Sequence, residues 1–161
     1  LLGSELKLTK DNMKVIMQEF TKAEQEKQNN QASINKVNGE EYLNANKTKE
    51  GVIETASGLQ YKIINSGTGK KPASTSKVLV HYRGTLIDGT EFDSSYARGE
   101  PVELAVNQVI KGWQETLPLM TTGSKWQIVV PSELGYGQRG ASGAIGPNAT
   151  LLFDIELIEI K

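Results

Sequence analysis

Residues 78–95 read VLVHYRGTLIDGTEFDSS, and this stretch decides the fold of the chain. Apolar and polar side chains alternate between residues 77 and 87, which predicts a β-strand with Val80 and Tyr82 on the same face. The dipeptide Asp88-Gly89 then signals a tight hairpin turn. We therefore expect an antiparallel sheet built around this strand.

The segment 150–160 gives the clearest further strand. Its alternation is the cleanest in the chain, and the apolar side chains on one face are Leu151, Phe153, Ile155 and Leu157. Shorter strands are expected at 59–65 and 126–130, while residues 112–120 are long enough for a single short helix. An antiparallel sheet with one helix covering its apolar face is an α+β fold.

The composition changes near Gly51. The chain before it is rich in Lys, Glu, Gln and Asn and has no proline, whereas all 5 prolines follow it. We predict one long helix from about Lys10 to Asn46, with Thr9 as its N-cap. The chain is thus divided into a helical arm, residues 1–50, and a β-rich domain, residues 51–161.

An apolar stripe occupies the first part of the predicted helix. Its members fall at i, i+3, i+4 and i+7 and are Met13, Ile16, Met17 and Phe20. The stripe needs a surface to pack on, and either residues 1–8 fold back on it or a partner chain covers it. Residues 24–35 are nearly all polar, which is typical of a solvated helix that bridges two bodies.

Composition argues against several classes of function. The net charge of −1 lacks the basic excess of a nucleic-acid surface, and the absence of cysteine excludes disulfides. A single histidine, His81, argues against a zinc site, and we expect no metal or cofactor. No apolar run approaches the roughly 20 residues of a membrane span. We see no signal peptide, and a start at Leu1 indicates processing or truncation.

Two patterns that suggest other chemistry are set aside. Residues 135–140 match G-x-G-x-x-G, but the glycines and the proline that follow prevent the helix that a dinucleotide site requires. His81 lies in the middle of a predicted strand, between Val80 and Tyr82, so we interpret it as a structural histidine and not as part of a serine triad.

The remaining unusual residues form the inventory of an apolar cup. Tyr82, Phe92 and Asp93 come from the first hairpin, and QVIKGW at 108–113 adds Val109, Ile110 and Trp113. A cup of this kind has very few polar groups. It suits a ligand that is apolar and lacks an N–H, such as a prolyl peptide.

The order of the motifs adds a resemblance. The motifs are H-Y-x-G at 81–84, F-D-S-S at 92–95, V-I-x-G-W at 109–113, L-G-Y-G at 134–137 and A-T-L-x-F-D at 149–154. This series resembles the FK506-binding-protein (FKBP) family of peptidyl-prolyl cis-trans isomerases. The polar helix followed by GVIETASGLQYK at 51–62 resembles the bacterial Mip (macrophage infectivity potentiator)-like branch, in which an N-terminal helical domain dimerises.

The resemblance implies a fold and a set of site residues. The implied fold is a bent antiparallel sheet wrapped around one short helix, preceded here by a long helix. The implied catalytic residues are Tyr82, Phe92, Asp93, Trp113, Tyr136 and Phe153. Those implied to bind substrate or inhibitor also include Arg98, Val102, Gln108, Val109, Ile110 and Ile145. In this family Trp113 would be the floor, Asp93 a buried carboxylate paired with Arg98, and Tyr136 a donor to the substrate carbonyl.

The resemblance also implies partners. They are proline-containing unfolded or partly folded polypeptides, macrolides such as FK506 or rapamycin, and a second copy of the chain through the N-terminal helices. The chain would begin inside the second helix of the family's N-terminal domain. The implied location is the periplasm or the bacterial surface, with the cytoplasm as the alternative.

Departures from the eukaryotic pattern fall at the rim. Val102 stands where many members have phenylalanine, Gln108 where they have glutamate, and Ala141 and Ala144 where larger residues are common. We expect a more open rim.

The leading interpretation is an isomerase. A binding module without turnover is the alternative, and chaperone activity of the arm can coexist with either.

Overall fold

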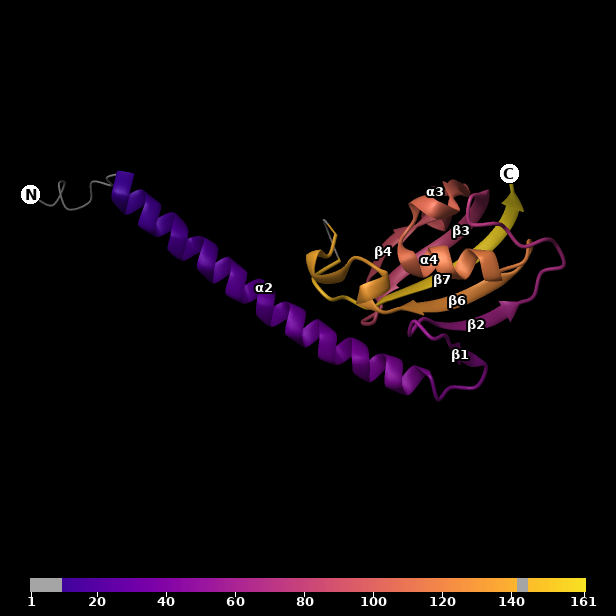
Figure 1. Cartoon of the computed structure of the whole chain (residues 1–161), viewed down its shortest axis with the longest axis horizontal. Coiled ribbons are helices and arrows are strands. Elements are labelled where there is room, and N and C mark those ends of the chain that lie inside the picture. The colour runs from indigo at the N-terminus through magenta and orange to yellow at the C-terminus, as the bar shows by residue number, and fades with distance from the viewer. Residues whose placement is uncertain (1–9, 142–144) are drawn as a thin grey trace, which may run out of the picture.

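The structure, a computed structural model, describes residues 10–141 and 145–161. Figure 1 shows a long helix that runs away from a curved sheet. The helices are α2 (Lys10–Asn46), α3 (Ser95–Arg98) and α4 (Lys111–Thr116). The strands are β1 (Val52–Glu54), β2 (Gln60–Asn65), β3 (Lys77–Leu86), β4 (Glu91–Ser94), β5 (Val102–Ala105), β6 (Lys125–Val130) and β7 (Leu151–Ile160). The expected α+β architecture is confirmed.

The long helix has the bounds that the sequence predicts, Lys10 to Asn46. The predicted N-cap Thr9 and residues 1–8 lie outside the described residues. The last turn is fastened to the sheet, because Asn46 Nδ2 donates to Gln60 Oε1 at 2.8 Å and Gln60 Nε2 donates to Leu43 O at 2.9 Å. A buried amide pair therefore sets the point where the arm leaves the domain.

The sheet is antiparallel throughout and has the order β1-β2-β6-β7-β3-β4. The strand β5 pairs with β3 on the same edge as β4, at Lys77 to Val80, while β4 pairs further along at Arg83 to Thr85. The predicted Asp88-Gly89 turn is present, with Leu86 N donating to Thr90 O at 2.8 Å and Gly89 at φ 91°. The hairpin thus sets the register that places Gly84 opposite Asp93.

The core lies between the sheet and α4, which crosses one face of it (Figure 1). All four residues predicted on one face of β7 are buried, as are Val78 and Val80 on β3. The helix predicted at 112–120 is shorter than expected. It ends at Thr116, and residues 117–119 continue as a 3₁₀ turn with Pro118 at its start, since proline has no N–H to extend an α-helix.

Apart from 3₁₀ turns, three short elements of the described residues were not predicted. They are β1, β5 and α3, each of three or four residues. The predicted strand at 59–65 begins at Gln60, and the predicted strand at 77–87 ends at Leu86. Within the described residues, no helix is both long and apolar enough to cross a membrane.

Candidate active site

Four aromatic rings from separate elements meet between the sheet and α4. The rings of Tyr82 and Phe153 each lie 5.1 Å from the Trp113 ring in edge-to-face geometry, and Phe92 contacts Phe153 in the same way at 5.6 Å. Trp113 lies in the first turn of α4, where its backbone N–H donates to Ile110 O at 3.0 Å, and only 4% of its surface is exposed. Aromatic pairs in this geometry hold one another in fixed orientation, so the cluster forms a preorganised apolar wall.

Gly84 makes room for two of these rings. A Cβ at this position would lie 2.5 Å from Phe92 Cζ and 2.9 Å from Phe153 Cε1. Gly84 sits mid-strand in β3, with Asp93 on one side and Phe153 on the other. The glycine of the H-Y-x-G motif is therefore required by the space that the rings occupy.

A polar group of three side chains lies beside the aromatic wall. Tyr82 Oη donates to Asp93 Oδ2, Arg98 Nη1 donates to Asp93 Oδ1 at 2.5 Å, and Arg98 Nη2 donates to Tyr82 Oη at 3.1 Å. The short helix α3 brings Arg98 into place, because Ser94 caps it by accepting from Ala97 N at 3.3 Å. Each carboxylate oxygen of Asp93 thus has one donor.

The exposure of this group differs from the expectation. Asp93 was predicted to be buried, but its side chain is 40% exposed and that of Arg98 is 47% exposed. Partial burial tends to raise the pKa of Asp93, yet the hydrogen bonds from Tyr82 and Arg98 outweigh it, so the pKa lies below its usual value. Burial and the hydrogen bond to Asp93 raise the pKa of Tyr82. Around neutral pH the carboxylate is therefore ionised and the phenol protonated.

Comparison with known proteins identifies the family. Residues 68–158 match "FKBP-type peptidyl-prolyl cis-trans isomerase", and residues 1–63 match "Domain amino terminal to FKBP-type peptidyl-prolyl isomerase". The chain belongs to the FKBP-type isomerases. The resemblance inferred from the motifs is confirmed, including its Mip-like character, because "Outer membrane protein MIP" of Legionella longbeachae is 48% identical over 163 residues.

Individual FKBP-type relatives cover most of the chain. The Legionella protein aligns with 99% of this chain and 70% of its own length. The "FKBP-type 22 kDa peptidyl-prolyl cis-trans isomerase" of Escherichia coli is 58% identical over 122 residues, which is 76% of this chain and 59% of the relative. The crystal structure of FkpA from Escherichia coli superposes with a TM-score of 0.88 at 39% identity, covering 96% of this chain and 74% of that one.

The other predicted FKBP site residues divide into two groups. Val109 and Ile110 pack against the core cluster, and Gln114 Nε2 fixes their segment by donating to Val109 O at 2.6 Å. Ile145 belongs to the same cluster and is 8% exposed. Tyr136 is 41% exposed and lies between two 3₁₀ turns. Three predicted residues lie outside the described core cluster, namely Val102, Gln108 and Tyr136.

One residue that supports the candidate site was missed by the sequence reasoning. Ser95 is fully buried, and its Oγ accepts from Tyr82 N at 2.7 Å and lies 2.7 Å from His81 Nδ1. It therefore fixes the backbone behind Tyr82. Ser95 is the second serine of the F-D-S-S motif, and this motif was the sequence feature that could have indicated its role. The same contacts, together with stacking on Tyr96 at 4.6 Å, agree with the structural role expected of His81.

Proposed function

We propose that this FKBP-type protein accelerates cis-trans isomerisation of X–Pro bonds in unfolded and partly folded polypeptides. The observation that carries the proposal is the aromatic cluster with one ionised, doubly hydrogen-bonded carboxylate at its edge. An apolar wall of this shape accepts a proline ring, which has no N–H to satisfy. A large binding pocket with many polar groups is not needed for a reaction that makes and breaks no covalent bond.

The chemistry follows from amide resonance. Rotation about an X–Pro bond faces a barrier of about 18–20 kcal/mol because the C–N bond has partial double-bond character. Resonance places charge on the carbonyl oxygen, and water stabilises that charge. A water-poor site therefore favours the twisted amide, in which resonance is lost. Shape complementarity to that twisted form supplies further stabilisation of the transition state.

The roles proposed for individual residues are as follows. Trp113 supports the proline ring from below, while Tyr82, Phe92 and Phe153 form walls. Asp93 faces the twisted carbonyl group, and its position is set by Arg98. Tyr136 donates from its exposed hydroxyl to a carbonyl of the bound chain, as the Ile110 N–H does. Among the described residues, the Trp113 indole Nε1 is the one buried side-chain donor without a partner, which leaves a donor at the floor of the cup.

Two substitutions test these roles. We expect Asp93→Leu to lower kcat/KM about 10-fold or more, because hydrogen bonds to a charged group are worth about 1.5–3 kcal/mol. Tyr136→Phe removes one neutral hydroxyl, and a loss of about 2- to 10-fold is expected. The measurement is the cis-to-trans rate of a succinyl-Ala-Leu-Pro-Phe anilide, with and without FK506.

Tyr42→Phe is the matched control, since Tyr42 lies on the arm, away from the cup. Circular dichroism must show that each variant is folded. Wild-type isomerisation rates in folded Asp93→Leu and Tyr136→Phe would contradict the roles proposed for Asp93 and Tyr136. Tight peptide binding by a folded wild-type protein that gives no acceleration would instead favour a binding module.

FK506 or rapamycin would occupy the same cup, with Val102, Gln108 and Ala141 at its rim.

We further propose that a second copy of the chain covers the apolar stripe of α2, and that residues 1–50 are part of a dimerisation domain. The stripe residues are exposed by 53, 49, 61 and 61% at Met13, Ile16, Met17 and Phe20. A monomer in water would be left with this face exposed on the first part of α2, which runs away from the domain (Figure 1). A dimer would place two cups at the ends of two arms, an arrangement suited to holding a non-native chain.

The oligomeric state tests the dimer. Met17→Ser with Phe20→Ser should convert a dimer into a monomer in sedimentation equilibrium, because two large apolar side chains are lost from the contact, each worth about 1.5–3 kcal/mol. Val37→Ser is the control, since Val37 is also 53% exposed on the same helix but outside the stripe. A wild-type protein that stays monomeric at high concentration contradicts the proposal.

We propose a location in the bacterial envelope for the same protein. The support is that a relative covering nearly the whole chain carries the name "Outer membrane protein MIP". Chaperone activity on exported chains would fit that location, and it would show as suppression of aggregation that the double variant on the stripe lacks.

A further inference from the structure

The second half of α2 contacts the segment that leads from the site to β7. Asn35 Nδ2 donates to Pro147 O at 2.8 Å, and Asn148 Nδ2 donates to Ala32 O at 3.4 Å. These pairs are separated by more than 100 residues in the chain. The part of the helix that was predicted to be solvated therefore has one face in contact with the domain.

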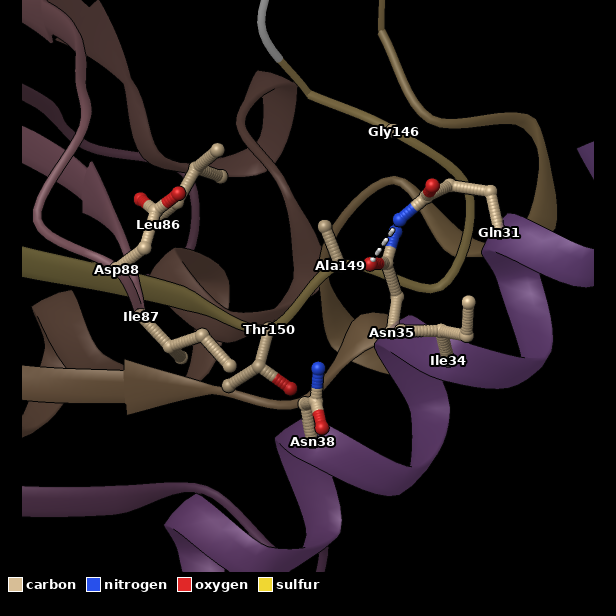
Figure 2. Close-up of a pocket in the computed structure, with 10 residues that line it drawn as sticks. All are labelled: Gln31, Ile34, Asn35, Asn38, Leu86, Ile87, Asp88, Gly146, Ala149 and Thr150. Carbon is tan, nitrogen blue, oxygen red and sulfur yellow. Dashed lines mark hydrogen bonds between the residues drawn. The ribbon is translucent and has the colours of Figure 1, made fainter.

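Two further features show that this contact is specific. Gln31 Nε2 donates to Asn35 Oδ1 at 2.8 Å and so orients the Asn35 amide toward the domain (Figure 2). Gly39 is buried mid-helix, and a Cβ there would lie 2.2 Å from Thr150 Oγ1 and 3.2 Å from its Cβ. Because glycine is unfavourable in a helix interior relative to alanine, its presence here reflects the close approach of the helix to Thr150.

The segment that α2 holds is connected to two parts of the site. Ile145 lies two residues before Pro147, is packed into the core cluster, and accepts from Ala141 N at 3.0 Å. In the other direction, Asn148 N donates to Gly137 O at 2.9 Å, and Gly137 directly follows Tyr136. Asn148 holds the left-handed backbone needed for this bend, with φ 54°.

The contact is narrow. A cavity of about 390 Å³ separates α2 from the β3–β4 turn, and its walls include Ile34 and Asn38 on the helix and Ile87 and Asp88 on the turn (Figure 2). Among the residues that the structure describes, no broad apolar interface closes this gap, as Ile34 remains 53% exposed.

We propose that α2 is a positioning element for the prolyl site. Asn35 and Gly39 hold the segment 147–150, and this segment in turn holds Ile145 and Tyr136 at the cup. The position of the arm then sets the affinity for substrate, while the aromatic wall, whose rings all come from other elements, sets the rate of rotation. This role of α2 rests on the proposed isomerase function. It adds a form of regulation, because a non-native chain that pulls on the arm would alter the site.

The test separates KM from kcat. Asn35→Ala should raise KM for the tetrapeptide about 2- to 10-fold, the range for one lost hydrogen bond, with kcat within about twofold of wild type. Thr21→Ala is the control, because Thr21 Oγ1 donates to Met17 O at 2.8 Å within the exposed helix, well before the contact at Ala32 and Asn35. Its KM should equal that of the wild type.

A compensating pair excludes a simple folding defect. Gly39→Ala should raise KM even though alanine favours the helix, and Gly39→Ala with Thr150→Ala should restore it, since the second change removes the hydroxyl that the new methyl group meets. A second readout is independent of turnover: amide hydrogen exchange of Ala141 and Asn148 should be faster in Asn35→Ala than in Thr21→Ala. Unchanged exchange and unchanged KM in Asn35→Ala overturn the proposal. If the wild-type protein does not accelerate isomerisation, only the proposed isomerase function is contradicted. The comparison of amide hydrogen exchange still tests whether α2 holds the segment 147–150.

Discussion

The Trp113→Ala variant is expected to lose about 3–5 kcal/mol of unfolding free energy, the range for removing a buried tryptophan side chain. The indole is 4% exposed and is contacted edge-on by Tyr82 and Phe153. Two rings lose a neighbour together, and the cavity opens toward the cup where collapse is limited. Urea unfolding followed by the fluorescence of Trp126, the second of the chain's 2 tryptophans, gives the value.

The Trp113→Leu variant serves as the companion. Leucine refills part of the volume, so its loss should be smaller than that of alanine, and its fold should survive well enough for a rate measurement. We expect its kcat/KM to fall, because the floor of the cup is no longer flat. A loss below about 1 kcal/mol for Trp113→Ala, the level of an average substitution, would show that the indole is not packed as described.

Gly84→Ala is expected to have the second-largest effect. The added Cβ would lie 2.5 and 2.7 Å from two atoms of the Phe92 ring and 2.9 Å from one of Phe153. Both rings are held by edge-to-face contacts, so relief requires a shift of the wall itself. Overpacking of this kind costs about 1–3 kcal/mol, and we expect kcat/KM to fall at least about 10-fold in protein that is still folded.

Gly89→Ala is the control for Gly84→Ala. A Cβ at Gly89 meets no described atom within 4 Å, but the residue has φ +91°, so alanine there introduces backbone strain without a clash. It should lose about 1 kcal/mol of stability and keep its isomerase rate. Equal rates for the two variants would mean that the ring positions do not matter for catalysis.

The parts of the fold that could be predicted are those with a long repeating pattern. The bounds of α2 follow from its composition and stop signals, and β7 follows from the alternation of apolar and polar residues between Leu151 and Leu157. The strands β1 and β5 could not be predicted, because three or four residues carry no period and their extended form depends on pairing with β2 and β3. The early end of α4 depends on Pro118, a signal that was present but given too little weight.

The candidate site was also predictable only in part. The rings that meet at Trp113 were predicted from the order of the motifs, and the pairing of Asp93 with Arg98 was predicted with them. The exposure of Asp93 was not, since burial depends on what neighbouring elements leave uncovered. The contact of Asn35 with Pro147 was also missed, because an asparagine on a polar helix face looks the same whether it meets water or a carbonyl group.

The strand order has a consequence for how the molecule is made. β7 lies between β6 and β3, so the strand synthesised after all the other described strands occupies the middle of the sheet. A nascent chain that has not yet reached Leu151 carries two open strand edges and an aromatic wall without Phe153. Such edges invite pairing with other chains. Until β7 is inserted between β3 and β6, the nascent domain therefore presents two strand edges with which another chain can pair.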